Sequence, residues 1–216
     1  MSLTIDFHAH TSISKDSLTS PERILSAARR KKLDRLVITD HNSIAGALAA
    51  HALDPERIII GEEIMTTKGE ILAAYVSREI PRGLSPQETI QQLREQGAFI
   101  SVSHPFDSWR NGAWKMEDLL EITPLVDAIE ILNSRCSTAA DNQRAKEFAF
   151  QYKLPGTAGS DAHAAFELGA ARMVLPQFNG PEELRKVILD GEVKGGLSPF
   201  WVHFFSFYAR WRKMVV

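Results

Sequence analysis

The chain has 216 residues, of which 44% are hydrophobic and 24% charged, and this balance excludes a disordered protein. The length suits a single domain over residues 1–216 with a full apolar core. The formal net charge of −2 does not indicate a nucleic-acid binder, and the lone cysteine, Cys136, excludes an internal disulfide and a cysteine-based zinc cluster. The sequence has neither an apolar run of about 18 residues nor a signal-peptide pattern, so we expect a cytoplasmic protein without a transmembrane segment.

Strand-like and helix-like segments alternate along the chain. Ser20-Pro21-Glu22 supplies an N-cap, a first-turn proline and an acidic first turn, which predicts a helix to about Lys32. Ser85 to Glu88 reads as a capping box that opens a helix ending at Gly97. The predicted strands are 3–7, 35–39, 57–64, 70–76, 98–103, 127–132, 157–160 and 172–175. The remaining predicted helices are 44–53, 116–122, 139–152 and 180–191.

This alternation predicts a parallel sheet with right-handed crossovers. Seven or eight such units in 216 residues favour a closed α/β barrel over the alternative, a doubly wound open sheet. In a closed parallel barrel the C-terminal ends of all strands open on one face, where side chains from distant segments converge.

Histidines and carboxylates gather at those predicted strand ends. The histidines are His8, His10, His41, His104 and His163, and the carboxylates are Asp6, Asp16, Asp40, Glu62, Glu63 and Asp161. Imidazole together with carboxylate suits zinc, manganese or iron, and clustered carboxylates need a cation to offset their repulsion. His51, inside a predicted helix, and His203, near the C-terminus, are interpreted as ordinary core or surface residues.

The segments DFHAHTSISKD, ITDHNS, GEEI, SHPFD and GSDAH resemble, in order and place, the motifs of the PHP (polymerase and histidinol phosphatase) metal-dependent phosphoesterases. The resemblance covers residues 4 to about 169. It implies a distorted TIM-like (β/α)7 barrel with the metal site at the C-terminal ends of the strands. It also implies hydrolysis of a phosphate ester by a metal-bound hydroxide, with two to three divalent ions (zinc, manganese or iron).

Position by position, the resemblance implies three sets of metal ligands. They are His8, His10, Glu63 and Asp161 for the first ion, Glu63 and His104 for the second, and Asp16, His41 and His163 for the third. Three-metal relatives carry a further histidine after the bridging glutamate, in a GEIH-like strand, and Leu72 stands at that place here. We therefore expect two tightly held ions and a middle ion that binds only with phosphate.

Four residues are expected to act on the substrate. Asp161 or His163 would move the proton, and Arg110 and Arg135 resemble arginines that grip phosphate in short PHP proteins. The alternative interpretation of both arginines is a solvated loop side chain.

A small phosphorylated compound is the expected substrate, and three alternatives remain. A nuclease acting on oligonucleotide ends is disfavoured by the net charge and by the absence of a large insertion between Glu63 and His104. A non-catalytic metal-binding regulatory module is disfavoured by the retained ligands. An amidohydrolase would need a lysine or a second histidine pair at a middle strand, which the sequence lacks.

The segment 200–213 is rich in aromatic side chains and ends with Arg212 and Lys213. Its helical spacing predicts a last helix that packs on the barrel. A homo-oligomer interface and a membrane-surface helix are the second and third interpretations.

Overall fold

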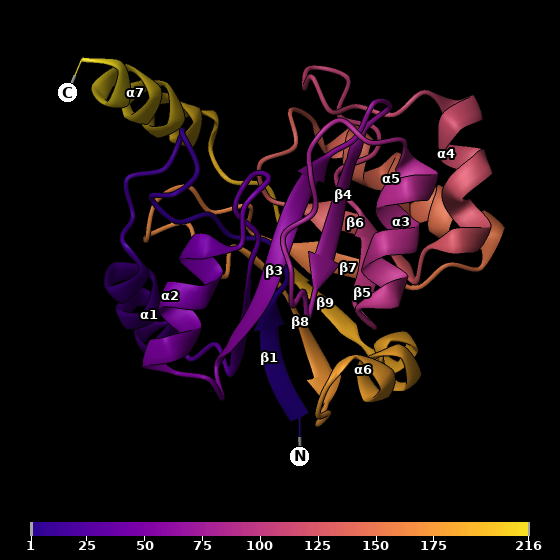
Figure 1. Ribbon diagram of the computed structural model, residues 1–216, viewed down its shortest axis with the longest axis horizontal. Coiled ribbons are helices and arrows are strands. Elements are labelled where there is room, and N and C mark those ends of the chain that lie inside the picture. The colour runs from indigo at the N-terminus through magenta and orange to yellow at the C-terminus, as the bar shows by residue number, and fades with distance from the viewer. Residues whose placement is uncertain (1, 216) are drawn as a thin grey trace.

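Nine strands form one sheet in the computed structural model, which describes residues 2–215 (Figure 1). The sheet order is β7-β6-β5-β4-β3-β2-β1-β8-β9. The strands are β1 (Ser2–Asp6), β2 (Arg35–Ile38), β3 (Ile58–Met65), β4 (Glu70–Ala74), β5 (Phe99–Val102), β6 (Ala128–Asn133), β7 (Gly156–Gly159), β8 (Ala171–Pro176) and β9 (Glu192–Gly195). The α-helices are α1 (Pro21–Arg30), α2 (Ala45–Leu53), α3 (Pro86–Glu95), α4 (Met116–Ile122), α5 (Ala139–Tyr152), α6 (Pro181–Val187) and α7 (His203–Met214).

The sheet closes on itself between the segment that continues β1 and the end of β7. The Phe7 amide donates to the Ala158 carbonyl at 3.2 Å, and the Asp161 amide donates to the His8 carbonyl at 2.8 Å. A Cβ at Gly159 would lie 2.3 Å from the His8 Cβ, so the two segments can approach this closely only because residue 159 is glycine. The expected TIM-like barrel is therefore confirmed, and β8 and β9 extend the sheet outside it.

The expectation of a fully parallel sheet is wrong. Strand β4 runs antiparallel to both β3 and β5, β8 runs antiparallel to β1, and β9, which was not predicted, runs antiparallel to β8. Only residues 66–69 connect β3 to β4, and a parallel crossover needs about a dozen residues, so these two strands form a hairpin. The start of β4 consequently lies at the same end of the barrel as the end of β3.

The helix starts follow the capping residues in the sequence. The Ser20 side chain accepts a hydrogen bond from the Arg23 amide, and Ser85 and Glu88 form the predicted capping box of α3. These caps satisfy amide groups that the first helical turn leaves without a carbonyl partner. The predicted strands and helices thus agree with the observed ones apart from small differences at their ends and the missed β9.

The deeper part of the barrel interior is apolar, and we call it the barrel floor. It is lined by Phe7, Val37, Leu72 and Phe99, and the rings of Phe7 and Phe99 lie 6.2 Å apart. These side chains are buried within a sheet that surrounds them, so the floor contributes to the hydrophobic stabilisation of the barrel, together with the apolar clusters between helices and sheet.

The C-terminal segment lies at the edge of the molecule (Figure 1). A short 3-10 turn at Phe200–Val202 leads into α7. Within residues 2–215, no helix combines the length and the apolar character that crossing a bilayer requires.

Candidate metal centre

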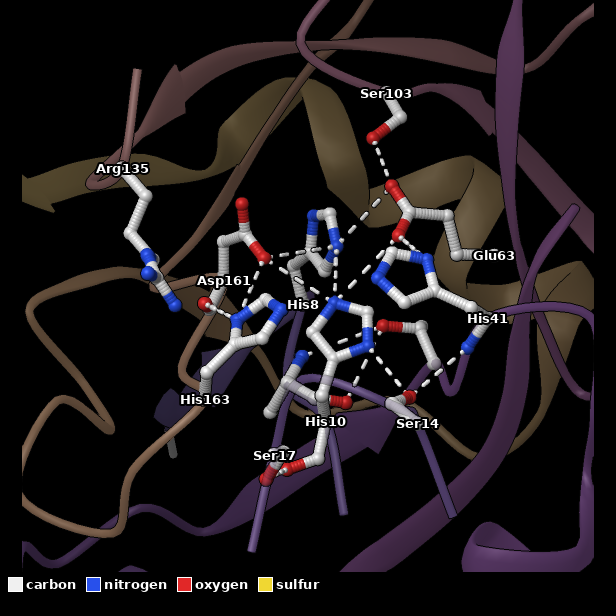
Figure 2. A network of polar contacts seen from close by, with 12 residues as sticks. His8, His10, Ser14, Ser17, His41, Glu63, Ser103, Arg135, Asp161 and His163 are labelled. Carbon is white, nitrogen blue, oxygen red and sulfur yellow. Dashed lines mark hydrogen bonds and ion pairs between the residues drawn. The ribbon is translucent and has the colours of Figure 1, made fainter. Parts of the chain in front are cut away.

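The predicted metal-binding side chains meet at the mouth of the barrel, and Figure 2 labels all of them except Asp16 and His104. They are His8, His10, Asp16, His41, Glu63, His104, Asp161 and His163. All are buried except His41, which is partly exposed. Residues far apart in the sequence therefore form one polar centre, which opens to solvent beside His41.

Glu63, on β3, lies in the middle of this centre. Its Oε2 is 2.9 Å from His41 Nδ1, and its Oε1 is 3.1 Å from His104 Nε2. The Ser103 hydroxyl donates a hydrogen bond to Oε1 at 2.7 Å. The two oxygens of one carboxylate thus face different histidines, an arrangement suited to bridging two cations.

Asp161 lies across the centre from Glu63 and has a left-handed backbone, with φ 52°. Its Oδ1 is 3.2 Å from His10 Nε2 and 3.4 Å from His163 Nδ1. Its Oδ2 is 2.7 Å from the Arg110 guanidinium. The backbone bend after β7 turns this carboxylate into the mouth, where Arg110 fixes its orientation.

Three histidines have one ring nitrogen bonded outward and the other directed into the centre. The outer partners are Glu130 for His8 Nδ1 at 3.0 Å, Ser14 Oγ for His10 Nδ1 at 3.2 Å and the Asp161 carbonyl for His163 Nδ1 at 2.8 Å. A histidine whose Nδ1–H is occupied in this way presents the lone pair of Nε2, which is the usual arrangement of a metal-binding imidazole.

Several oxygens in the centre are buried without a partner. Within residues 2–215, Asp16 Oδ1, Glu63 Oε2 and Asp161 Oδ1 accept no well-aligned hydrogen bond and face only imidazole nitrogens, at 2.9 to 3.5 Å. An unpaired buried carboxylate oxygen is costly unless an ion or ordered water satisfies it. The histidine and carboxylate donors fit zinc, manganese or iron, so the residues present suit a divalent cation.

The charges in the centre also favour a bound cation. Burial raises the pKa of Glu63, but the imidazoles of His8 and His41 outweigh burial and hold that pKa well below its usual range. Burial lowers the pKa of His8, but Asp161 and Glu63 outweigh it and raise that pKa well above the ordinary value. Burial, with His163 and His41, lowers the pKa of His10 to about 4. A bound cation would supply the positive charge that the carboxylates otherwise draw from a protonated His8.

Glu70, the first residue of β4, lies beside Glu63 and His104, where the sequence analysis expected no further side chain. Glu70 Oε2 is 3.5 Å from His104 Nε2, and its Oε1 is 3.9 Å from His41 Nδ1. Leu72 instead lines the barrel floor, two residues further along the antiparallel strand. Glu70 is therefore within reach of a cation held by Glu63 together with His104 or His41. In a fully parallel barrel only the end of each strand reaches the mouth, so the start of β4 was not expected there.

Three of the carboxylates expected at the strand ends do not face the centre. Asp6 accepts hydrogen bonds from the Ser160 and Gly169 amides and so ties β1 to the segment after β7. Asp40 accepts from the Thr11 amide, and Glu62 accepts from the Ile80 amide on the outer side of β3. Because side chains alternate along a strand, Glu62 and Glu63 point to opposite sides of the barrel wall.

The two predicted phosphate-binding arginines lie beside the centre with different partners. Arg110 contacts Asp161 and also Asp107, at 3.0 Å. Arg135 is buried, donates to the Ser206 hydroxyl at 2.9 Å, and has an NH1 that donates to no group within residues 2–215. The expectation of a solvated loop side chain does not hold for Arg135.

A third arginine, missed by the sequence analysis, reaches the centre from α7. Arg210 NH2 lies 2.8 Å from Asp16 Oδ2. The two residues are 194 positions apart, so no local pattern in the sequence could have paired them.

Comparison with known proteins agrees with this architecture. The model of the PHP domain matches residues 6–104, and the model of the PHP-associated region matches residues 139–193. The protein MJ0417 of Methanocaldococcus jannaschii is 34% identical over 180 residues, which cover 82% of this chain and 72% of the relative.

Two solved structures share the fold at low sequence identity. One is a two-domain protein from Bacteroides vulgatus that contains a predicted PHP-like metal-dependent phosphoesterase, with a TM-score of 0.73 and 18% identity over 97% of this chain and 70% of that one. The other is a lesion-specific endonuclease from Pyrococcus furiosus, with a TM-score of 0.61 and 19% identity over 92% of this chain and 60% of that one.

Proposed function

The chain belongs to the PHP domain family, and from this premise we propose that it is a metal-dependent phosphoesterase that hydrolyses a small phosphate ester. The observation that carries the proposal is the set of buried carboxylate oxygens without hydrogen bonds, on Asp16, Glu63 and Asp161, surrounded by histidines. Bound cations would offset the negative charge of this set, and clustered divalent cations are suited to phosphate chemistry.

We propose three ligand sets. The first is His8, His10, Glu63 and Asp161, the second is Glu63, Glu70 and His104, and the third is Asp16, His41 and His163. When bound, the ions supply Lewis acidity, which acidifies water and offsets negative charge on the phosphate oxygens. Glu70 gives the middle ion a third protein ligand, so this proposal expects it to bind without phosphate.

The remaining roles follow from charge and position. The pKa of Asp161 is held well below its usual range, because Arg110 and His8 outweigh burial, and burial with Arg135 lowers the pKa of His163. Both groups are therefore unprotonated near neutral pH, but its depressed pKa makes Asp161 a weak base, so His163 is the better candidate to accept a proton from water. Arg135, with one nitrogen unpaired, and Arg110 supply N–H donors for phosphate oxygens.

The test is an activity screen of protein loaded with zinc, manganese or iron. The substrates are an aryl phosphomonoester, an aryl phosphodiester and short single-stranded oligonucleotides. We expect hydrolysis of the monoester, loss of that activity in chelator, and loss of activity and metal in Glu63→Gln. His51→Ala is the matched control, because His51 lies outside the centre and hydrogen-bonds the Ile58 carbonyl.

Each other outcome favours an alternative function. Cleavage of oligonucleotides without hydrolysis of the monoester would establish the nuclease. Bound metal with no hydrolysis of any substrate would favour the non-catalytic metal-binding module. Full activity in chelator with no metal by elemental analysis would overturn the proposal altogether.

A further inference from the structure

Helix α7 is attached to the barrel mouth through one polar face. Ser206 accepts from Arg135 at 2.9 Å, Arg210 pairs with Asp16 at 2.8 Å, and the Lys213 ammonium donates to the Ser14 carbonyl at 2.7 Å. Between these contacts the small side chain of Ala209 is buried. These bonds hold the helix in a fixed orientation on the loop that carries Asp16.

The opposite face of α7 has no protein partner in the described chain. Phe200, Phe204, Phe207, Trp211 and Met214 are 74%, 63%, 63%, 55% and 78% exposed. Phe204, Phe207, Trp211 and Met214 lie three or four residues apart on α7 and form one stripe. Phe200, in the preceding 3-10 turn, continues this stripe, which we call the aromatic stripe. A continuous apolar stripe of this kind on a surface indicates an interaction site, because scattered single residues would not align. The helix thus packs on the barrel through its polar face, whereas the aromatic side chains whose spacing predicted it, Trp201, Phe204, Phe205 and Tyr208, are exposed.

The C-terminal segment that carries the aromatic stripe is rich in cationic side chains, of which Arg210 pairs with Asp16 and Lys194 with Glu192. Residues 193–216 include Lys194, Arg210, Arg212 and Lys213 but contain neither aspartate nor glutamate, although the whole chain has a net charge of −2. Arg212 directly follows Trp211 and is exposed. Positive charge is thus concentrated on the one helix that also exposes aromatic side chains.

We propose that α7 lies in the plane of an anionic lipid surface, with the aromatic stripe inserted among the headgroups and Arg212 beside anionic lipids. Phenylalanine, tryptophan and methionine on one helix face, flanked by arginine and lysine, are the features of an interfacial helix. A second copy of the chain fits less well, because pairing two α7 helices would bring cations together with no carboxylate on either helix. A nucleic-acid strand on the stripe would lie on the face turned away from the metal centre.

The test is co-sedimentation of the protein with vesicles, and it needs neither metal nor substrate. We compare phosphatidylcholine alone with phosphatidylcholine containing about one third phosphatidylglycerol. We expect at least about tenfold tighter binding to the anionic vesicles, and a loss of at least about tenfold in the double variant Phe204→Ser/Phe207→Ser. The matched control is Phe150→Ser, since Phe150 on α5 is 89% exposed but has no aromatic stripe around it.

A second variant keeps the proposal falsifiable if the double variant unfolds. Arg212→Glu leaves the aromatic stripe intact and should remove most of the preference for anionic vesicles. Three results would overturn the proposal: vesicle binding that none of these substitutions changes, a dimer in light scattering that the double variant converts to monomer, or binding of single-stranded DNA in place of vesicles.

Discussion

The mouth and the floor of the barrel are built from the same strands, but their inward-facing side chains are polar at the mouth and apolar in the floor. At the mouth, Glu63, Glu70 and Asp161 are buried together with histidines, and some of their oxygens have no hydrogen-bond partner. In the floor, Phe7 and Phe99 pack against each other in an apolar interior. Along β4 the change takes only two residues, from Glu70 to Leu72. Depth along a strand therefore decides whether an inward side chain contributes to chemistry or to stability.

Removing the largest floor side chain should produce the largest change in stability. Phe99 is fully buried on β5. Phe99→Ala should lower the free energy of unfolding by about 3 to 5 kcal/mol, because it removes buried apolar surface and leaves a cavity. Urea denaturation of the metal-free protein measures this loss. In the folded fraction of Phe99→Ala, the metal content should equal that of the wild type. A lower metal content in this folded fraction would contradict the separate roles of mouth and floor.

The corresponding change at the mouth should affect activity without affecting the fold. Asp161→Asn keeps a residue that tolerates the left-handed backbone at φ 52°. It should lower kcat by roughly a hundredfold or more, because the substituted amide is a poorer metal ligand than the carboxylate. Circular dichroism should be unchanged and metal content should fall. His51→Ala should change neither, and equal effects of the two substitutions would contradict the assignment of the histidines.

Two residues of β4 provide the sharpest contrast. Glu70→Gln should weaken the binding of one of the three ions by at least about tenfold, because a ligand is lost. It should leave the free energy of unfolding nearly unchanged, because no cavity forms. Leu72→Ala should instead cost about 2 to 5 kcal/mol of stability and leave the metal count intact. Elemental analysis after dialysis, paired with urea denaturation, measures both quantities. Identical metal counts in the two variants would exclude Glu70 from the centre.

The smallest effect is expected from alkylation of Cys136, although this residue follows β6 close to the mouth. It is buried, and burial raises the pKa of its thiol well above the ordinary value, so the thiolate is scarce at pH 8. We expect alkylation by iodoacetamide at pH 8 to be at least about tenfold slower in the folded protein than in urea. Mass spectrometry follows the modification. Rapid alkylation with loss of activity would indicate that this thiol is accessible and takes part in the metal centre.

The sequence predicted the parts of the molecule that depend on local chemistry. The cap at Ser20 and the capping box at Ser85 marked where helices begin, and buried apolar runs marked the strands. The antiparallel direction of β4 was not predicted, although the connection 66–69 is too short for a parallel crossover. For the same reason Glu70 was not predicted to lie in the centre, since strand direction determines which end of a strand reaches the mouth.

Contacts over long sequence distances were the second limit. No pattern indicates that Arg210 pairs with Asp16, or that Asp6 joins β1 to the segment after β7 instead of joining the metal ligands. In both cases the residue type was compatible with several roles, and only the closed barrel selects one of them.

From the closure of the barrel we also predict an order of events during folding. His8 and Asp161 become neighbours only when the continuation of β1 pairs with the end of β7, a contact between distant parts of the chain. Contacts of such separation require an entropically costly loop closure and form late in folding. Cations that need both residues would therefore bind after the rate-limiting step. Bound metal should then slow unfolding much more than it speeds refolding, and the lifetime of the native protein would depend on the supply of metal.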